Sequence, residues 1–367
     1  MRERVDHLEL LRKVRRSAAD RRKTILALYG LLILVLASMA VIASGRAAQH
    51  GDWMGQFKTT FLTPLLATRE FFETAFRLGQ WSAMALVLLG IWLVATLVGS
   101  FFGLAVTRMV AVQITCDRRP EVGEALRFAR SHWFWAFVTP TSLLFAALAL
   151  LGVAALFLWL AASIWQPLMV AAIPITLFLA SGAAFMLIGL LAGGILAGPT
   201  IATEWSDAFD AITRIYGYGF THTYRLFAYR GAGLLVLLVA AGARIFRAVL
   251  VFGFGYIVLL AVLGASHTRE LFDAFLLEPP SGVERAPSDQ IVGWTVLFCG
   301  GAYLSAIVAR LLVYALALRQ VIYLRLRLHI DKVPLDNIDG YRPDDSAFDP
   351  TAQGFELVEV EEEIRAE

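Results

Sequence analysis

Four arginines lie in or beside long apolar stretches and are the residues most suited to binding an anion. Arg244 and Arg247 stand at positions i and i+3, which face the same side of a helix. Arg108 and Arg310 belong to two other segments and lie near the expected cytoplasmic rim, where they could share a site with this pair. A charge inside a membrane is costly and marks a candidate functional position. The pattern therefore predicts a site for a lipid phosphate or another anion at these four arginines.

The depth of Arg244 and Arg247 decides between this anionic site and a simpler role. If the helix enters the membrane near Gly231, the pair lies about 20 Å inside, at the usual rise of 1.5 Å per residue. If residues 231 to 243 lie at or above the headgroups, the two side chains only extend to the water interface. The sequence leaves both interpretations open.

The segments that must position these arginines have the composition of a membrane protein. Hydrophobic residues make up 58% of the chain and charged residues 17%, and the mean hydropathy is +0.67. A bilayer core needs about 20 apolar residues per helical crossing. Six runs qualify, at about 24 to 44, 82 to 107, 134 to 163, 169 to 198, 231 to 264 and 291 to 318. We expect an all-α fold, a polytopic transmembrane helical bundle of about six spans within residues 24 to 330.

The two ends of the chain carry opposite charge. The leader, residues 1 to 23, has nine Arg or Lys residues, whereas the tail, residues 331 to 367, is acidic. Basic segments stay in the cytoplasm, and six spans return the chain to the side on which it began. We therefore expect a protein of the bacterial inner (cytoplasmic) membrane with both termini cytoplasmic. The acidic tail could bind a protein partner, and a homo-oligomer is a further possibility.

Amphipathic segments separate several of the spans and predict helices that lie along the membrane surface. The segment from 206 to 216 has Ser206 as a candidate N-cap and ends at Gly217. A similar segment at 118 to 133 follows the second span, and residues 45 to 80 have scattered charges and aromatics. We expect interfacial helices between spans two and three and between spans four and five.

Glycines recur four or five residues apart in two of the spans. Small residues at this spacing let helix backbones approach closely in a membrane. We therefore expect helix packing at Gly99, Gly103, Gly189, Gly193, Gly194 and Gly198.

Three short stretches resemble a known group of proteins: GPTIATEWSDAFDAITRIYGY, RRPEVGEALRFARSHW and IYLRLRLHIDKVPLDNID. They are similar to uncharacterised bacterial multi-pass membrane proteins related to the membrane domain of glycerophosphoryl diester phosphodiesterases, over residues 85 to 340. The resemblance implies a helical membrane domain without an assigned reaction. The soluble catalytic barrel of the phosphodiesterases has no counterpart in these residues, so no catalytic residue carries over.

No motif predicts catalysis or a cofactor. Cys116 and Cys299 lack the CxxC spacing of a metal or redox site, and there is no HExxH or GxSxG motif. We expect no enzyme activity, no cofactor, no metal and no nucleic-acid partner. The most fitting function is a non-enzymatic membrane protein that binds or organises anionic lipid or partner proteins. The alternative is a transporter or channel for a small anionic solute.

Overall fold

Helices account for almost every residue that the structure describes. The computed structural model describes residues 7–50, 54, 56, 60, 64–164, 166–275 and 287–333, and no strand occurs in them. The acidic tail beyond residue 333 therefore lies outside the described residues. The elements are α1 (His7–Ala18), α2 (Arg21–His50), α4 (Pro64–Arg77), α5 (Trp81–Val98), η1 (Gly99–Gly103), α6 (Leu104–Thr115), α7 (Val122–Ile164), α8 (Gln166–Glu204), α9 (Ala208–Tyr216), η2 (Gly217–Thr221), α10 (Thr223–Phe275) and α11 (Pro287–Ile330).

Six stretches of these helices are long and apolar enough to cross a membrane. They are Arg21–Ala48, Trp81–Thr115, Val122–Ile164, Val170–Leu191, Thr223–Val262 and Cys299–Ile330. The predicted all-α, multi-pass architecture is therefore confirmed. Several spans are longer than predicted, because the helices continue past the apolar runs into charged segments at one end of the molecule.

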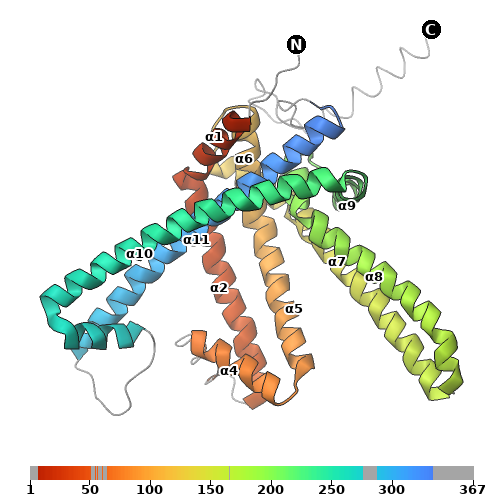
Figure 1. Ribbon diagram of the computed structural model, residues 1–367, viewed down its shortest axis with the longest axis horizontal. Coiled ribbons are helices and arrows are strands. Elements are labelled where there is room, and N and C mark those ends of the chain that lie inside the picture. Colours follow the sequence, from red (N-terminus) through yellow and green to blue (C-terminus); the bar gives the residue numbers. More distant parts are fainter. Residues whose placement is uncertain are drawn as a thin grey trace, which may run out of the picture.

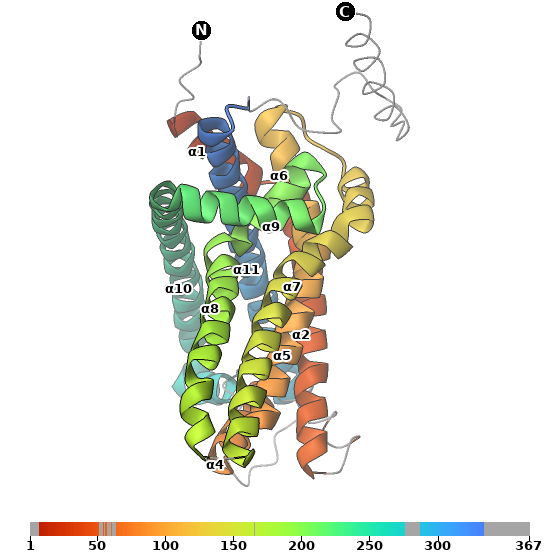
Figure 2. The ribbon, with the colours of Figure 1, turned by 90° about the vertical axis from the view of Figure 1, so that its right-hand side faces the viewer.

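The spans pair into three helical hairpins, α2 with α5, α7 with α8, and α10 with α11 (Figure 1). The hairpins meet at one end of the molecule and spread apart toward the other. We call the first the convergent end. Helices α1, α6 and α9 and the last turns of α11 lie there (Figures 1 and 2). At the other end, α4 packs on α2 and α5 through Phe71, which is buried with Ile42 and Val87.

The hydrophobic core lies at the convergent end and is centred on α6. Ten of the twelve residues of this helix are buried. One core cluster joins α1, α2, α6, α7 and α11 through residues such as Val14, Ala27, Met109, Ala129 and Ala317. By contrast, only 6% of the most apolar window of α10 is buried. Apolar side chains that the bundle leaves exposed can face lipid, which supplies no hydrophobic drive to cover them.

The structure changes three details of the predicted interfacial helices. The segment at 118 to 133 is not a separate helix beyond Val122, since α7 runs from Val122 through the span. The N-cap of α9 is Asp207, not Ser206, because the Asp207 carboxylate accepts a hydrogen bond of 2.8 Å from the backbone N–H of Asp210. Gly217 does not end the helical path, which continues as the π-helix η2.

Candidate functional site

Three of the four predicted arginines come together where α10 packs on α11. Arg244 lies within electrostatic range of Arg247 and Arg310. Its Nη1 donates a 3.3 Å hydrogen bond to the carbonyl oxygen of Ala240, one turn earlier. Its guanidinium carbon lies 5.5 Å from the ring centroid of Tyr314 on α11, within cation–π range. We call Arg244, Arg247 and Arg310 the arginine cluster.

The arginine cluster faces an apolar surface. Arg247 and Arg310 are exposed, and within the described part of the chain neither forms a hydrogen bond or an ion pair. Their neighbours Ile245, Phe246 and Val249 are exposed as well, as expected of a helix that faces lipid. Two positive charges without counter-charges therefore lie on a surface whose other exposed side chains are apolar.

Arg108 lies apart from the arginine cluster in contacts of its own. It is 5% exposed, and its Nη1 donates a 2.7 Å hydrogen bond to the carbonyl oxygen of Ala202, in the last turn of α8. Its guanidinium carbon lies 4.8 Å from the ring centroid of Phe128 and 5.7 Å from that of Trp205. A cation at a helix C-terminus satisfies a free carbonyl and complements the helix dipole. Arg108 thus joins α6 to the end of α8.

A second charged group, which the sequence analysis missed, is centred on Glu204 at the end of α8. Its carboxylate side chain is 4% exposed. One oxygen lies 2.9 Å from Nε of Arg327 and also accepts a hydrogen bond from the Tyr323 hydroxyl, both on α11. The other oxygen lies 2.6 Å from Nη2 of Arg214 on α9. Glu204 thus holds together the ends of three helices at the convergent end.

Arg214 extends this group to the surface. Its guanidinium lies 3.3 Å from Asp210 and 3.5 Å from Asp331, just beyond the end of α11. The hydroxyl of Tyr218 in η2 donates a hydrogen bond to the same Asp331 carboxylate. We call Glu204, Arg214, Tyr218, Tyr323, Arg327 and Asp331 the Glu204 cluster. It fixes α9 and η2 against α8 and α11.

The electrostatics of the Glu204 cluster depend on its two guanidinium groups. Burial raises the pKa of Glu204, while the Tyr323 hydroxyl, Arg214 and Arg327 oppose that rise. Burial alone lowers the pKa of Arg214, but Tyr323, Glu204 and Asp210 together raise it above its ordinary value. Arg214 reaches water and several oxygens, so its charge is secure. The charge of Glu204 is the one that depends on its partners.

One signal in the sequence pointed to Glu204. It is the first acid after Glu124, and it comes at the end of two long apolar runs. Its partners could not be read from the sequence, because Tyr323 and Arg327 lie more than one hundred residues away.

The Glu204 cluster has the properties of a structural anchor. Its oxygens already face guanidinium groups and hydroxyls of the same chain. Among the described residues, no group of three or more His, Cys, Asp or Glu side chains could hold a metal ion.

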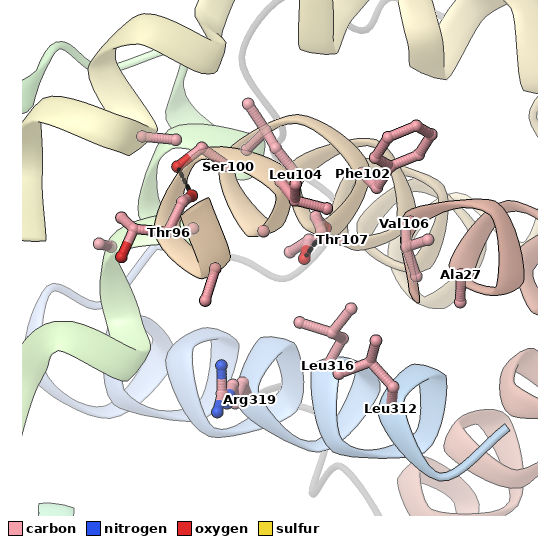
Figure 3. Close-up of a pocket in the computed structure, with 18 of the residues that line it drawn as sticks. Ala27, Thr96, Ser100, Phe102, Leu104, Val106, Thr107, Leu312, Leu316 and Arg319 are labelled. Atoms are coloured by element: carbon pink, nitrogen blue, oxygen red, sulfur yellow. Dashed lines mark hydrogen bonds between the residues drawn. The ribbon is translucent and has the colours of Figure 1, made fainter. Parts of the chain in front are cut away.

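A half-open cavity, which we call the interior cavity, lies between α2, α5, η1, α6, α7, α8 and α11. Its volume is about 300 Å³. Figure 3 shows Leu312, Leu316 and Arg319 on α11 facing Thr96 and Thr107 across it. This is the low end of the size range for small-molecule pockets.

The glycines for which we predicted helix packing have different surroundings. Gly99, Gly103 and Gly198 line the cavity, and a Cβ atom at any of them would meet nothing within 4 Å. Gly194 also lines it, and a Cβ there would lie 3.4 Å from Leu190 of its own helix. The side-chain surroundings of Gly193 lie outside the described residues.

Gly189 is in close contact with another element. A Cβ atom there would lie 2.7 Å from Cε1 of Tyr216, and closer still to the rest of that ring edge. Tyr216 stacks on Phe185 and Phe220, with ring centroids 4.9 Å and 5.7 Å away. This stack leaves the ring little freedom to move, so Gly189 lets the end of α9 rest on α8.

Gly189→Ala should lower the free energy of unfolding by about 2 kcal/mol, since the added methyl group forces the stacked Tyr216 ring aside. Gly152→Ala on α7 is the control and should be neutral or stabilising, because alanine favours the helix and nothing lies within 4 Å of its Cβ position. Thermal unfolding of the purified protein, followed by tryptophan fluorescence, measures both. In a Tyr216→Ala background the effect of Gly189→Ala should largely disappear; an unchanged loss there would contradict this assignment.

Comparison with protein-family models, with curated proteins and with solved structures gave no match. The resemblance to the membrane domain of glycerophosphoryl diester phosphodiesterases therefore stays a prediction, and the function has to be argued from the geometry.

Proposed function

We propose that this multi-pass protein is a non-enzymatic protein of the bacterial inner membrane that binds anionic lipid at the arginine cluster. The observation that carries the proposal is the presence of Arg247 and Arg310, exposed and without counter-charges in the described residues, beside Arg244 on a lipid-facing surface. Guanidinium groups bind phosphate oxygens in paired hydrogen bonds. A lipid phosphate would supply the negative charge that these arginines lack.

The charge distribution supports an orientation with the convergent end in the cytoplasm. Helix α1, with Arg12, Lys13, Arg15 and Arg16, lies at this end. Positively charged segments are retained in the cytoplasm, whose membrane leaflet is rich in anionic lipids.

The proposal predicts that lipid retention depends on two exposed arginines. The double variant Arg247→Gln/Arg310→Gln should hold phosphatidylglycerol about tenfold or more weakly, because each basic residue near an anionic membrane contributes about 1 kcal/mol. Native mass spectrometry of protein released from nanodiscs of phosphatidylglycerol and phosphatidylcholine measures the retention. The thermal unfolding midpoint should stay unchanged, because these side chains make no contacts that the fold needs.

The matched control is Arg69→Gln/Arg77→Gln on α4. These arginines are also exposed, but both pair with Glu73, so neither is without a counter-charge. Their replacement should leave phosphatidylglycerol retention within twofold of the wild type. Equal retention of phosphatidylglycerol by the wild type and both double variants would contradict the proposal.

The alternative, a transporter or channel for a small anionic solute, calls for Arg244 or Arg247 on the wall of a path through the membrane. The wall of the interior cavity contains neither residue. No observation therefore favours this alternative over lipid binding.

A further inference from the structure

The interior cavity combines one charged side chain with an apolar wall. Of the described residues that line it, Arg319 alone carries a charge, and it projects from α11 (Figure 3). The cavity is separate from the arginine cluster, since none of the three cluster residues lines it. Any ligand that it holds is therefore independent of the lipid binding proposed above.

Arg319 lacks a counter-charge. Within the described residues it forms no hydrogen bond and no ion pair. The charged group that acts on it is another cation, Arg230, whose own Nη1 donates a 3.0 Å hydrogen bond to the carbonyl oxygen of Leu191. Arg319 and Arg230 thus place two guanidinium groups near each other, and Arg319 is exposed and has no counter-charge among the described residues. Two such charges attract an anion.

The hydroxyl groups on the cavity wall have no free proton to donate to a polar ligand. The hydroxyls of Thr96, Ser100 and Thr107 each donate to a carbonyl oxygen one turn earlier in their own helix, at 2.8 Å, 2.6 Å and 2.7 Å. Their protons are thus already used. The wall beyond them consists of aliphatic and aromatic carbon and of glycine, for example Leu34 and Phe102. A ligand needs an anionic group at one end and a hydrocarbon part for the remainder.

The positions of Leu312, Leu316 and Arg319 on α11 predict how a ligand is oriented in the cavity. Leu312, Leu316 and Arg319 are spaced i, i+4 and i+7, so they share one face over about 10 Å of helix. Because α11 runs toward the convergent end, Arg319 is the end of this face nearest to it. The apolar end of this face, at Leu312, lies on the side of the cavity where Ala27 and Val106 are (Figure 3).

From this geometry we infer that the interior cavity binds an anionic amphiphile with a single hydrocarbon chain, its carboxylate or phosphate at Arg319 and its chain between α2, η1 and α11. The cavity volume of about 300 Å³ is at the low end for small-molecule sites, which favours one hydrocarbon chain over two. The glycines of η1 provide the room, because side chains at Gly99 and Gly103 would fill it.

Photolabelling tests this assignment. The protein, in nanodiscs of phosphatidylcholine, is exposed to dodecanoic acid that carries a diazirine in mid-chain, and the labelled peptides are identified by mass spectrometry. Labelling is expected on α11 around Leu312 and Leu316. Unlabelled dodecanoate should compete at a concentration at least tenfold lower than dodecanol, which has the same chain but no charge. Inorganic phosphate, which has no chain, should not compete.

Two variants separate the charged end from the chain. Arg319→Gln should weaken competition by dodecanoate about tenfold and leave competition by dodecanol unchanged. Gly103→Leu should reduce labelling at least tenfold by filling the cavity. This variant should still fold, because Gly103 has helical backbone angles (φ −64°, ψ −42°) and open space around its Cβ position. It therefore decides the matter even if Arg319→Gln does not fold.

The steric control is Gly152→Leu, at an exposed position on α7 with nothing within 4 Å and outside the cavity wall. It should be labelled like the wild type, as should Arg247→Gln/Arg310→Gln, so that failure here is distinct from failure of the arginine cluster. Undiminished labelling of Gly103→Leu would overturn the assignment. So would equal competition by dodecanol or by inorganic phosphate, since either removes the need for a charged head joined to a chain.

Discussion

Replacing Arg327 by leucine should lower the free energy of unfolding by about 3 kcal/mol at neutral pH, because removing one partner of a buried ion pair leaves the other charge uncompensated. Arg327 and Glu204 side chains are 7% and 4% exposed. Arg214 still faces the second oxygen of Glu204, which keeps the loss near the low end of the usual range. Unfolding by titration with a denaturing detergent measures the difference.

The loss should depend on pH. Without Arg327, the pKa of Glu204 rises further above its ordinary value of 4.5, since burial already raises it and one opposing charge is gone. A carboxyl group with a raised pKa in the folded state contributes its full stability below the ordinary value. That stability is lost as the pH rises through the folded-state value, by at most about 1.4 kcal/mol per pH unit. The deficit of Arg327→Leu should therefore shrink as the pH falls toward 4.5.

The double variant Glu204→Gln/Arg327→Leu is the control for this prediction. It removes the buried carboxylate together with its partner, so its stability should show less pH dependence than that of Arg327→Leu. A deficit of Arg327→Leu that stayed constant between pH 7 and pH 5 would show that lost packing, and not the charge of Glu204, is responsible.

Arg108→Leu should cost about 3 kcal/mol in unfolding free energy. The substitution leaves the Ala202 carbonyl without its donor and removes the cation from the rings of Phe128 and Trp205. Arg108→Lys retains the charge but not the planar group, and should lose about half as much. Thermal unfolding midpoints of the two variants provide the comparison.

The Arg108 variants also separate its structural role from lipid binding. If Arg108 acts only by joining α6 to α8, phosphatidylglycerol retention by the folded Arg108→Lys protein should equal that of the wild type. If Arg108→Lys retained less phosphatidylglycerol at unchanged stability, Arg108 would be part of the lipid-binding site, as the sequence predicted.

The spans could be predicted because hydrocarbon imposes a strict condition on the chain. Every backbone polar group must be hydrogen-bonded within the helix, so an apolar run of sufficient length predicts a membrane-spanning helix. The proximity of Arg244 and Arg247 follows in the same way from helical spacing. Arg310 joined them because α10 and α11 pair along their length, which the sequence did not reveal.

Other features depended on contacts between distant segments. The glycine spacing alone could not distinguish Gly189, which meets Tyr216, from Gly103, which borders empty space. Arg108 and Arg319 look alike in the sequence, since each directly follows an apolar run. Their surroundings differ because one guanidinium finds a helix end and two aromatic rings, and the other faces a cavity. The partners of an arginine are a property of the tertiary fold.

The three hairpins pack together at the convergent end and are separate at the other, so a small change of tilt at the convergent end produces a larger displacement at the free tip (Figure 1). Helix α7, with 43 residues, is about 65 Å long at the standard rise. A tilt of about 5° at that end would displace the free tip by roughly 6 Å over this length. Tilting of helices is one way in which membrane proteins match a thinner or thicker bilayer, and the Glu204 cluster ties α8, α9 and α11 together at the convergent end.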